Sequence, residues 1–233
     1  MDLSFYPVAS SSKGNCYIIR SESTNIMVDI GITIRALRGY FNNINVDITE
    51  HRIDGLLVTH EHIDHVRNVN NIMNESLKCN LFCSKGTGEA ISQKMKKVDP
   101  ERVNYIEKNQ TFMVGDIEVT AFGICHDAAE PLSYTFSKNG KKISIITDTG
   151  KMDEEMDEAI ADSDVLIIES NPEVNILLYG RYPYHVKRRK LGSRVIRQFS
   201  PEINKTGVLT CSTSRKAICG FIVMARFHTT SRS

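Results

Sequence analysis

Hydrophobic residues in the first half of the chain recur at two spacings, one typical of strands and one typical of helices. Alternating or clustered apolar positions predict strands, and these fall at residues 4–9, 15–20, 26–31, 53–58, 81–83, 103–106, 111–114 and 117–124. Apolar positions three and four residues apart predict helices, and these fall at residues 34–41, 66–73 and 87–98. The two patterns alternate, which favours an α/β chain with βαβ character.

The second half of the chain continues this pattern and then loses it. Strand patterns recur at residues 131–136, 142–146 and 165–168, and a helix pattern falls at residues 153–161. We therefore expect a second sheet to begin near the middle of the chain. From Leu191 onward the pattern weakens. The chain is expected to form one domain over residues 1–233, with a divergent last part at 191–233.

Composition fits one soluble domain and limits its partners. The 233 residues are 41% hydrophobic and 24% charged, with a net charge of +1. This balance argues against a general polyanion binder but allows a local basic patch. No apolar stretch approaches the roughly 20 residues that span a bilayer, and the N-terminus lacks signal-peptide features. The six cysteines form no C-x-x-C pair, so neither a disulfide framework nor a zinc knuckle is expected. We predict a cytoplasmic protein without a membrane partner, and its oligomeric state stays open.

A group of metal-binding side chains follows the strand predicted at 53–58. His60, His62, Asp64 and His65 fall within six residues, in what the pattern indicates is a loop. Imidazole nitrogen and carboxylate oxygen together suit zinc or a similar divalent ion. The helical H-E-x-x-H motif of metalloproteases is absent, because a motif that begins at His60 would need its second histidine at position 64, which is Asp64. The alternative is a polar surface loop that happens to be rich in histidine.

The pattern His60-x-His62-x-Asp64-His65 resembles the H-x-H-x-D-H signature of the metallo-β-lactamase superfamily. Its members hold one or two metals between two β-sheets. The resemblance covers about residues 4–190, and the later motifs Ser170-Asn171 and Gly180-Arg181-Tyr182-Pro183 are most similar to the YycJ (WalJ) branch, regarded as DNA exonucleases. It implies an αββα sandwich of two mixed β-sheets flanked by helices, within the α/β class.

The resemblance also implies a set of metal ligands. One metal would be held by His60, His62 and His126, the second by Asp64 and His65, and Asp148 would bridge the two. His126 and Asp148 each stand at the end of a predicted strand, although alone they would be ordinary surface or turn residues. Asp64 would also orient the attacking hydroxide, which makes Asp64 and Asp148 the catalytic candidates. Zinc is the expected metal, with manganese as the alternative, as one or two ions.

Asp29 begins the Asp-x-Gly sequence at the end of the strand predicted at 26–31, and it has two interpretations. In the resembled family this strand end lies beside the metal loop, where the carboxylate could orient a ligand. It could equally be an acidic residue near the N-terminus of the following helix.

The late part of the chain departs from the family pattern. Relatives supply one more histidine at the end of a late strand, where this chain has Cys211. The thiolate could bind zinc or be a buried structural thiol, and His185 and His228 are weaker substitutes. Pro172 stands where the close branch has a histidine. These differences suggest a divergent member, or a C-terminus altered by a change of reading frame.

A basic run offers a candidate contact surface for phosphate groups. Its members are Arg181, Lys187, Arg188 and Arg189, with tyrosines nearby that could stack on a base. The alternative is a solvated helix face that carries cations.

These observations predict a hydrolase that uses a metal-bound hydroxide on a phosphodiester, most similar to a DNA exonuclease, with DNA as its partner. One alternative is a hydrolase of a small ester, thioester or cyclic phosphate, because a fold does not specify its substrate. Another is a metal-binding scaffold with impaired catalysis, which the missing late histidine favours.

Overall fold

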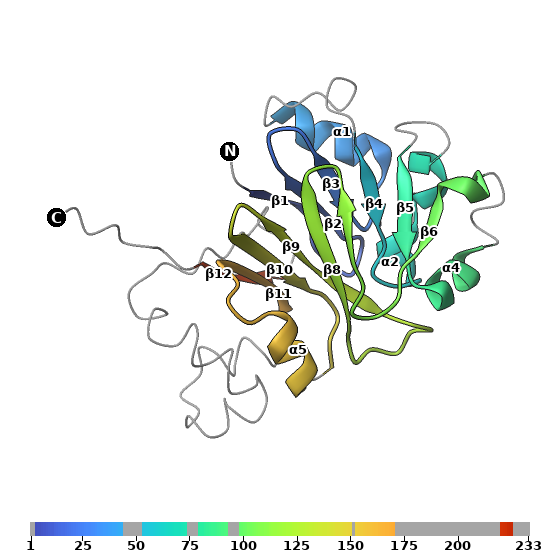
Figure 1. Ribbon diagram of the computed structural model, residues 1–233. Coiled ribbons are helices and arrows are strands. Elements are labelled where there is room, and N and C mark those ends of the chain that lie inside the picture. Colours follow the sequence, from blue (N-terminus) through green and yellow to red (C-terminus); the bar gives the residue numbers. More distant parts are fainter. Residues whose placement is uncertain are drawn as a thin grey trace.

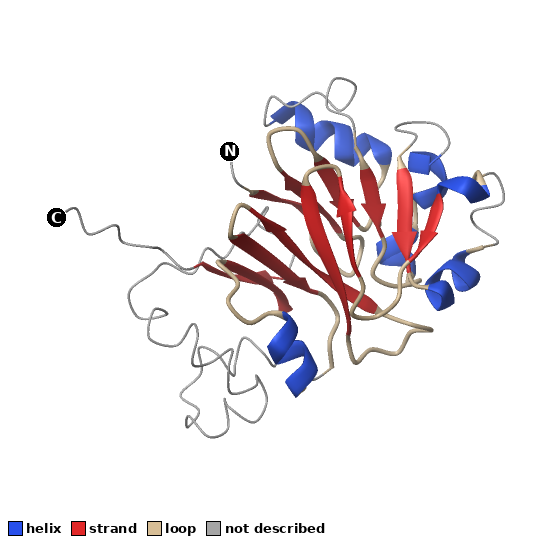
Figure 2. Ribbon diagram, viewed as in Figure 1, coloured by secondary structure: helices blue, strands red, loops and turns tan. Residues whose placement is uncertain are grey.

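Two six-stranded sheets lie face to face, with helices on their outer sides (Figures 1 and 2). The computed structural model describes residues 3–43, 53–73, 79–92, 98–150, 152–170 and 220–225, without the side chains of 169–170 and 220–225. This is the αββα sandwich that the sequence predicts, and the fold prediction is confirmed.

The first sheet has the strand order β1-β2-β3-β4-β5-β6. Its strands are β1 Ser4–Ala9, β2 Cys16–Arg20, β3 Asn25–Val28, β4 Gly55–Leu57, β5 Asn80–Cys83 and β6 Val103–Tyr105. β1, β2 and β3 pair antiparallel, whereas β3 to β6 pair parallel. The carboxyl ends of β3 and β4 therefore lie at the same edge of the sheet.

The second sheet has the order β12-β11-β10-β9-β8-β7. Its strands are β7 Thr111–Val114, β8 Ile117–Gly123, β9 Leu132–Lys138, β10 Lys141–Ile146, β11 Val165–Ser170 and β12 Gly220–Ala225. β10 and β11 are parallel and the other neighbours are antiparallel. Because β9 separates β8 from β10 and runs against both, the ends of β8 and β10 share one edge.

The helices are short, and most of those described lie on the outer face of the first sheet (Figure 1). They are α1 Ile34–Asn43, α2 Ile63–Val66, α3 Val69–Asn71, α4 Lys85–Ile91, the 3₁₀ helix Pro100–Arg102 and α5 Glu154–Ala159. Helices α1 to α4 pack on the first sheet, and α5 lies on the second sheet beside β8. Among the described residues, no helix has both the length and the apolar character needed to cross a membrane.

Two hydrophobic cores hold the layers together. One core joins the first sheet to its helices through buried side chains such as Leu37, Leu56 and Ile91. The other fills the space between the two sheets, with Ile19 and Val28 from the first and Phe136 and Ile145 from the second. Consecutive buried residues on strands such as β2 and β4 are typical of a sheet that is covered on both faces, whereas β8 alternates buried and exposed positions.

Hydrogen bonds also join the sheets near the end of β4. The Tyr134 hydroxyl in β9 donates to the Val58 carbonyl at 2.8 Å, and the Leu132 amide donates to the Thr59 carbonyl at 2.9 Å. The loop after β4 is thereby fixed against the second sheet.

The boundaries of several elements differ from the sequence prediction. The helix expected at 66–73 is two short helices, α2 and α3, and the first begins at Ile63. Asn68 leaves the helical conformation between them, with φ −116° and ψ 18°, and its side-chain amide donates to the Ile32 carbonyl instead. β3 ends at Val28 because Asp29 adopts a left-handed backbone with φ 59°.

β12 was not predicted from the sequence. It pairs antiparallel with β11 from Val165↔Ala225 to Ser170↔Gly220. Its letters, Gly-Phe-Ile-Val-Met-Ala, are an apolar run of ordinary strand length, and that run was the available signal. The proposed single domain over 1–233 stays a prediction.

Candidate metal site

Six proposed ligands come from one edge of the sandwich, where strands of both sheets end. The first sheet supplies His60 and His62 from the loop after β4, and Asp64 and His65 from the first turn of α2. The second sheet supplies His126 after β8 and Asp148 after β10. The ligand set therefore spans the interface between the sheets. His126 and Asp148 lie at the same edge of the second sheet because β8 and β10 run in the same direction.

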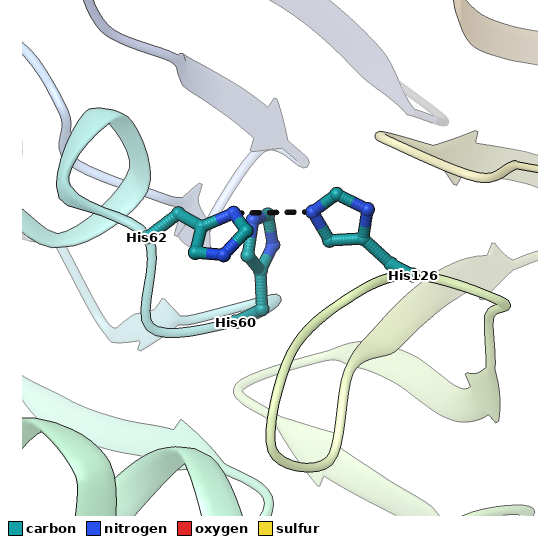
Figure 3. Close-up of side chains that lie close together, drawn as sticks. All are labelled: His60, His62 and His126. Atoms are coloured by element: carbon teal, nitrogen blue, oxygen red, sulfur yellow. Dashed lines mark hydrogen bonds between the residues drawn. The ribbon is translucent and has the colours of Figure 1, made fainter.

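His60, His62 and His126 form a compact group of imidazoles (Figure 3). One nitrogen of each lies within 4.8 Å of the others, and His62 Nδ1 is 3.1 Å from His126 Nε2. Two nitrogens bound to one tetrahedral zinc lie about 3.3 Å apart, from zinc–nitrogen distances of about 2.0–2.1 Å. The spacing of these three side chains fits one divalent metal.

Thr59 selects the tautomer of His60. The Thr59 hydroxyl donates its one hydrogen to Asp29 Oδ2 at 2.9 Å, so it accepts from His60 Nδ1 at 3.0 Å. This leaves a lone pair on His60 Nε2, which is buried and has no hydrogen-bond partner in the part of the chain that the structure describes. Burial, with the neighbouring His65, lowers the pKa of His60 to about 2, which keeps this imidazole neutral and able to bind a metal.

Asp29 orients His65. Its fully buried carboxylate lies 2.7 Å from His65 Nδ1 and accepts the Thr59 amide at 2.9 Å. The Nδ1 hydrogen therefore points to Asp29, and Nε2 points toward Asp148. Helix α1 begins only at Ile34, so of the two interpretations of Asp29 the geometry favours the ligand-orienting one.

His60, His65 and Asp148 form a second group, which shares His60 with the first. Asp148 Oδ2 lies 2.8 Å from His65 Nε2 and 3.8 Å from His60 Nε2, and Asp64 Oδ2 lies 3.8 Å from His65 Nε2. Although burial opposes it, the carboxylates of Asp29 and Asp148 raise the pKa of His65 to about 11. The carboxylates around His65 therefore favour a positive charge at this position, which is also what a metal ion would supply.

The backbone at Asp148 helps to direct its carboxylate. Asp148 has φ 50°, a left-handed conformation that aspartate tolerates better than most residues. The turn lets the side chain leave the end of β10 toward the histidines. Its side chain is 29% exposed, and that of Asp64 is 25% exposed, whereas His60 and His65 are fully buried. The site is therefore open to solvent on its carboxylate side.

Three further residues at the site were not predicted from the sequence. Thr59 is described above, and Asn15 Nδ2 lies 2.9 Å from His65 Nε2. Glu61 Oε1 accepts the Ala129 amide at 2.8 Å, which ties the loop after β4 to the loop after β8. In the sequence, each is an ordinary turn or loop residue. Each comes close to the proposed ligands or their loops only because the fold pairs strands that are distant in the sequence.

Other predicted residues cannot be placed. The basic run and the candidate late ligands lie outside the described residues, namely Arg181, His185, Lys187, Arg188, Arg189, Cys211 and His228.

Known proteins resemble this chain over most of its length. The model of the Beta-lactamase superfamily domain matches residues 24–185. Exodeoxyribonuclease YycJ of Bacillus anthracis is 32% identical over 191 residues, which cover 82% of this chain and 71% of the relative. Exodeoxyribonuclease WalJ of Streptococcus pneumoniae is 31% identical over 186 residues, which cover 79% and 68%. The resemblance to the YycJ (WalJ) branch is confirmed.

Solved structures share the fold at low identity. Zn²⁺-bound PqqB from Methylobacterium extorquens has a TM-score of 0.61 at 14% identity, covering 82% of this chain and 80% of that chain. A diphosphatase of the PhnP family has a TM-score of 0.56 at 13% identity, covering 71% and 72%. These structures show the same fold, and the family match together with the two relatives shows that the chain belongs to the metallo-β-lactamase superfamily.

Proposed function

We propose that this protein is a metal-dependent phosphodiesterase that degrades DNA as an exonuclease. The observation that carries the proposal is the pair of ligand groups that share His60, each with its ligand atoms within 4.8 Å. Two adjacent metal positions suit the displacement of an oxygen from a phosphate. The names of the two exodeoxyribonuclease relatives support DNA as the substrate, and a cytoplasmic location is part of the proposal.

The proposed roles combine the ligand set that the family resemblance implies with the geometry of the site. His60, His62 and His126 would hold one metal, and Asp64, His65 and Asp148 the other, with Asp148 between them. A bound divalent metal, zinc or alternatively manganese, would lower the pKa of a water molecule and polarise a phosphoryl oxygen. His60 and His65 are buried, whereas Asp64, Asp148, His62 and His126 are partly exposed, and a substrate would approach the metals from these exposed side chains.

The remaining proposed contacts concern the substrate and the second metal. Arg181, Lys187, Arg188 and Arg189 would bind DNA phosphates, since nonspecific contacts of this kind fix the register of a strand. Cys211 would complete the second metal site as a thiolate. Both assignments rest on the sequence.

The test is digestion of end-labelled DNA by protein purified without chelator. We expect metal-dependent release of nucleotides from DNA ends, and a loss of about 100-fold or more in Asp148→Ala and in Asp64→Ala. Asp99→Ala is the matched control, because Asp99 caps the distant 3₁₀ helix at Pro100–Arg102. Near wild-type digestion by Asp148→Ala would contradict its bridging role.

A binding measurement separates the nuclease from a hydrolase of small esters. A polyanion site loses affinity for single-stranded DNA steeply as the salt concentration rises. Binding releases counterions from the DNA, and added salt makes that release less favourable. If the protein shows no salt-dependent DNA binding and hydrolyses a small phosphoester or thioester, it is a hydrolase of small esters and not a nuclease. Full metal content with no turnover on any of these substrates would indicate an impaired scaffold.

A further inference from the structure

Asn15 occupies an unusual position beside the proposed second metal site. It precedes β2 in the chain, yet its side chain lies next to His65, 50 positions away, with Nδ2 2.9 Å from His65 Nε2. Asn15 is 1% exposed. A buried polar group normally has a hydrogen-bond partner, and the amide of Asn15 is close enough to His65 Nε2 to influence metal binding at that nitrogen.

The hydrogen-bond network fixes which end of the amide faces His65. Asn15 Oδ1 accepts the Ser11 backbone amide at 3.0 Å and the Tyr17 hydroxyl at 3.3 Å. An oxygen is required at that end, because a backbone amide can only donate. Nδ2, which carries hydrogens alone, is therefore the atom directed at His65 Nε2.

The backbone holds Asn15 in place as well. Its amide donates to the Asp64 carbonyl at 2.7 Å, and its carbonyl accepts the Gly31 amide at 2.8 Å. The packing here is close, since a Cβ at Gly31 would lie 1.5 Å from the Asp64 oxygen. Asn15 cannot withdraw from His65 without disturbing the segment that carries the proposed ligands.

The amide and a metal therefore face the same nitrogen of His65. Because His65 Nδ1 faces Asp29, Nε2 is the nitrogen left for a metal, and it is the nitrogen that both Asn15 Nδ2 and Asp148 Oδ2 contact. Amide hydrogens carry partial positive charge and repel a cation. We propose that the Asn15 amide competes with the second metal for His65 Nε2 and so makes binding at the second position weaker than at the first. The proposal rests on the metal site of the proposed function.

The competition is tested by titrating metal-free protein with Zn²⁺ against a chromophoric chelator, without DNA. In Asn15→Ala we expect the second equivalent to bind roughly three- to tenfold more tightly, the size of one neutral hydrogen bond, while the affinity of the first stays unchanged. Asn104→Ala is the matched control, because Asn104 donates to the Leu81 carbonyl in the first sheet at 3.2 Å. It should leave both affinities as in the wild type.

A second variant keeps the test decisive if Asn15→Ala does not fold. Tyr17→Phe removes one of the two donors that hold Oδ1, so the amide can turn away, and the second equivalent should tighten by a smaller factor. Unchanged or weaker binding of that equivalent in the folded variants would overturn the competition even if DNA digestion continues. Failure of the wild-type protein to bind any zinc would overturn the proposed function and this inference together.

Discussion

Thr59 shows how one hydroxyl can prepare two ligands. It donates to Asp29 and accepts from His60, while Asp29 holds His65. The same small network therefore directs Nε2 of both imidazoles toward Asp148. Residues that orient ligands in this way commonly affect metal affinity almost as strongly as the ligands do.

We predict that Thr59→Val lowers the affinity of the protein for zinc by about 10- to 100-fold. Valine keeps the shape of the side chain but removes the acceptor that fixes the His60 tautomer. The measurement is competition with a chelator, beside a thermal melt of the metal-free variant. Thr111→Val is the control, since its hydroxyl pairs with Thr120 on an exposed part of the second sheet. Equal affinity in both variants would show that the His60 tautomer does not depend on Thr59.

The ligands could be predicted from the sequence, whereas the residues that orient them could not. Four ligands form one local motif, and His126 and Asp148 follow strand patterns at positions that the family resemblance marks. Thr59 and Asn15 carry no such mark. Their partners come from neighbouring strands, and a linear pattern does not specify which turn residues a sheet brings together.

At the scale of elements, two tight turns join the sheets at the end opposite the metal site. β3 and β8 both run from these turns toward the proposed ligands. Asp116, between β7 and β8, accepts the hydroxyls of Ser21 and Ser23 at 2.6 Å each and also pairs with Lys138. Ser21 and Ser23 lie between β2 and β3, so this cluster connects the first sheet to the second.

The Asp116 cluster predicts a dependence of stability on pH. Hydrogen bonds from Lys138, then Ser21 and Ser23, hold the pKa of Asp116 well below its usual range. A carboxyl whose pKa is depressed in the folded state stabilises it above the unfolded pKa, about 4 for aspartate, and loses that contribution as the pH falls. Asp116→Asn should therefore be less stable than the wild type at pH 7.

Urea denaturation across the pH range checks this prediction. The difference in the free energy of unfolding between wild type and Asp116→Asn should narrow as the pH falls below about 4. Because the Asp116 side chain is 37% exposed, the effect should also shrink in high salt. A difference that stays constant with pH would mean that the lost hydrogen bonds, and not the charge, account for the change.

Short elements were also harder to predict than the overall architecture. The strand and helix patterns gave the order of elements along most of the chain. Helix α2 nevertheless begins at Ile63, and its first turn carries Asp64 and His65 into the site. Hydrophobic spacing does not reveal this start, because these two residues are not hydrophobic. Only two of its residues, His65 and Val66, are buried, so its helical period is too brief to recognise.

At the scale of the whole molecule, the sandwich is joined at both ends of its strands. The Asp116 cluster connects the sheets at one end, and the proposed ligands face one another at the other. His60 and His62 follow a strand of the first sheet, and His126 and Asp148 follow strands of the second. A metal that binds across this boundary would stabilise the folded arrangement of both sheets, because it binds the native state in preference to the unfolded chain.

We therefore predict that zinc raises the melting temperature of the metal-free protein. At a free concentration of about 100 times the dissociation constant, the stabilisation is about 2.7 kcal/mol, or roughly 5–10 °C for a domain of this size. His126→Ala should lose most of this shift, because it removes the histidine that the second sheet gives to the first metal. Differential scanning calorimetry with and without zinc provides the measurement.

Two comparisons make this prediction specific to the site. Lys85→Ala, on an exposed part of α4 where Lys85 is 74% exposed, should keep the full shift, and a chelator should reverse it. The metal-free melting temperature of His126→Ala should stay near that of the wild type, because the ring is only partly buried and adds little to the core. An equal zinc shift in His126→Ala and wild type would mean that zinc does not join the two sheets through this histidine.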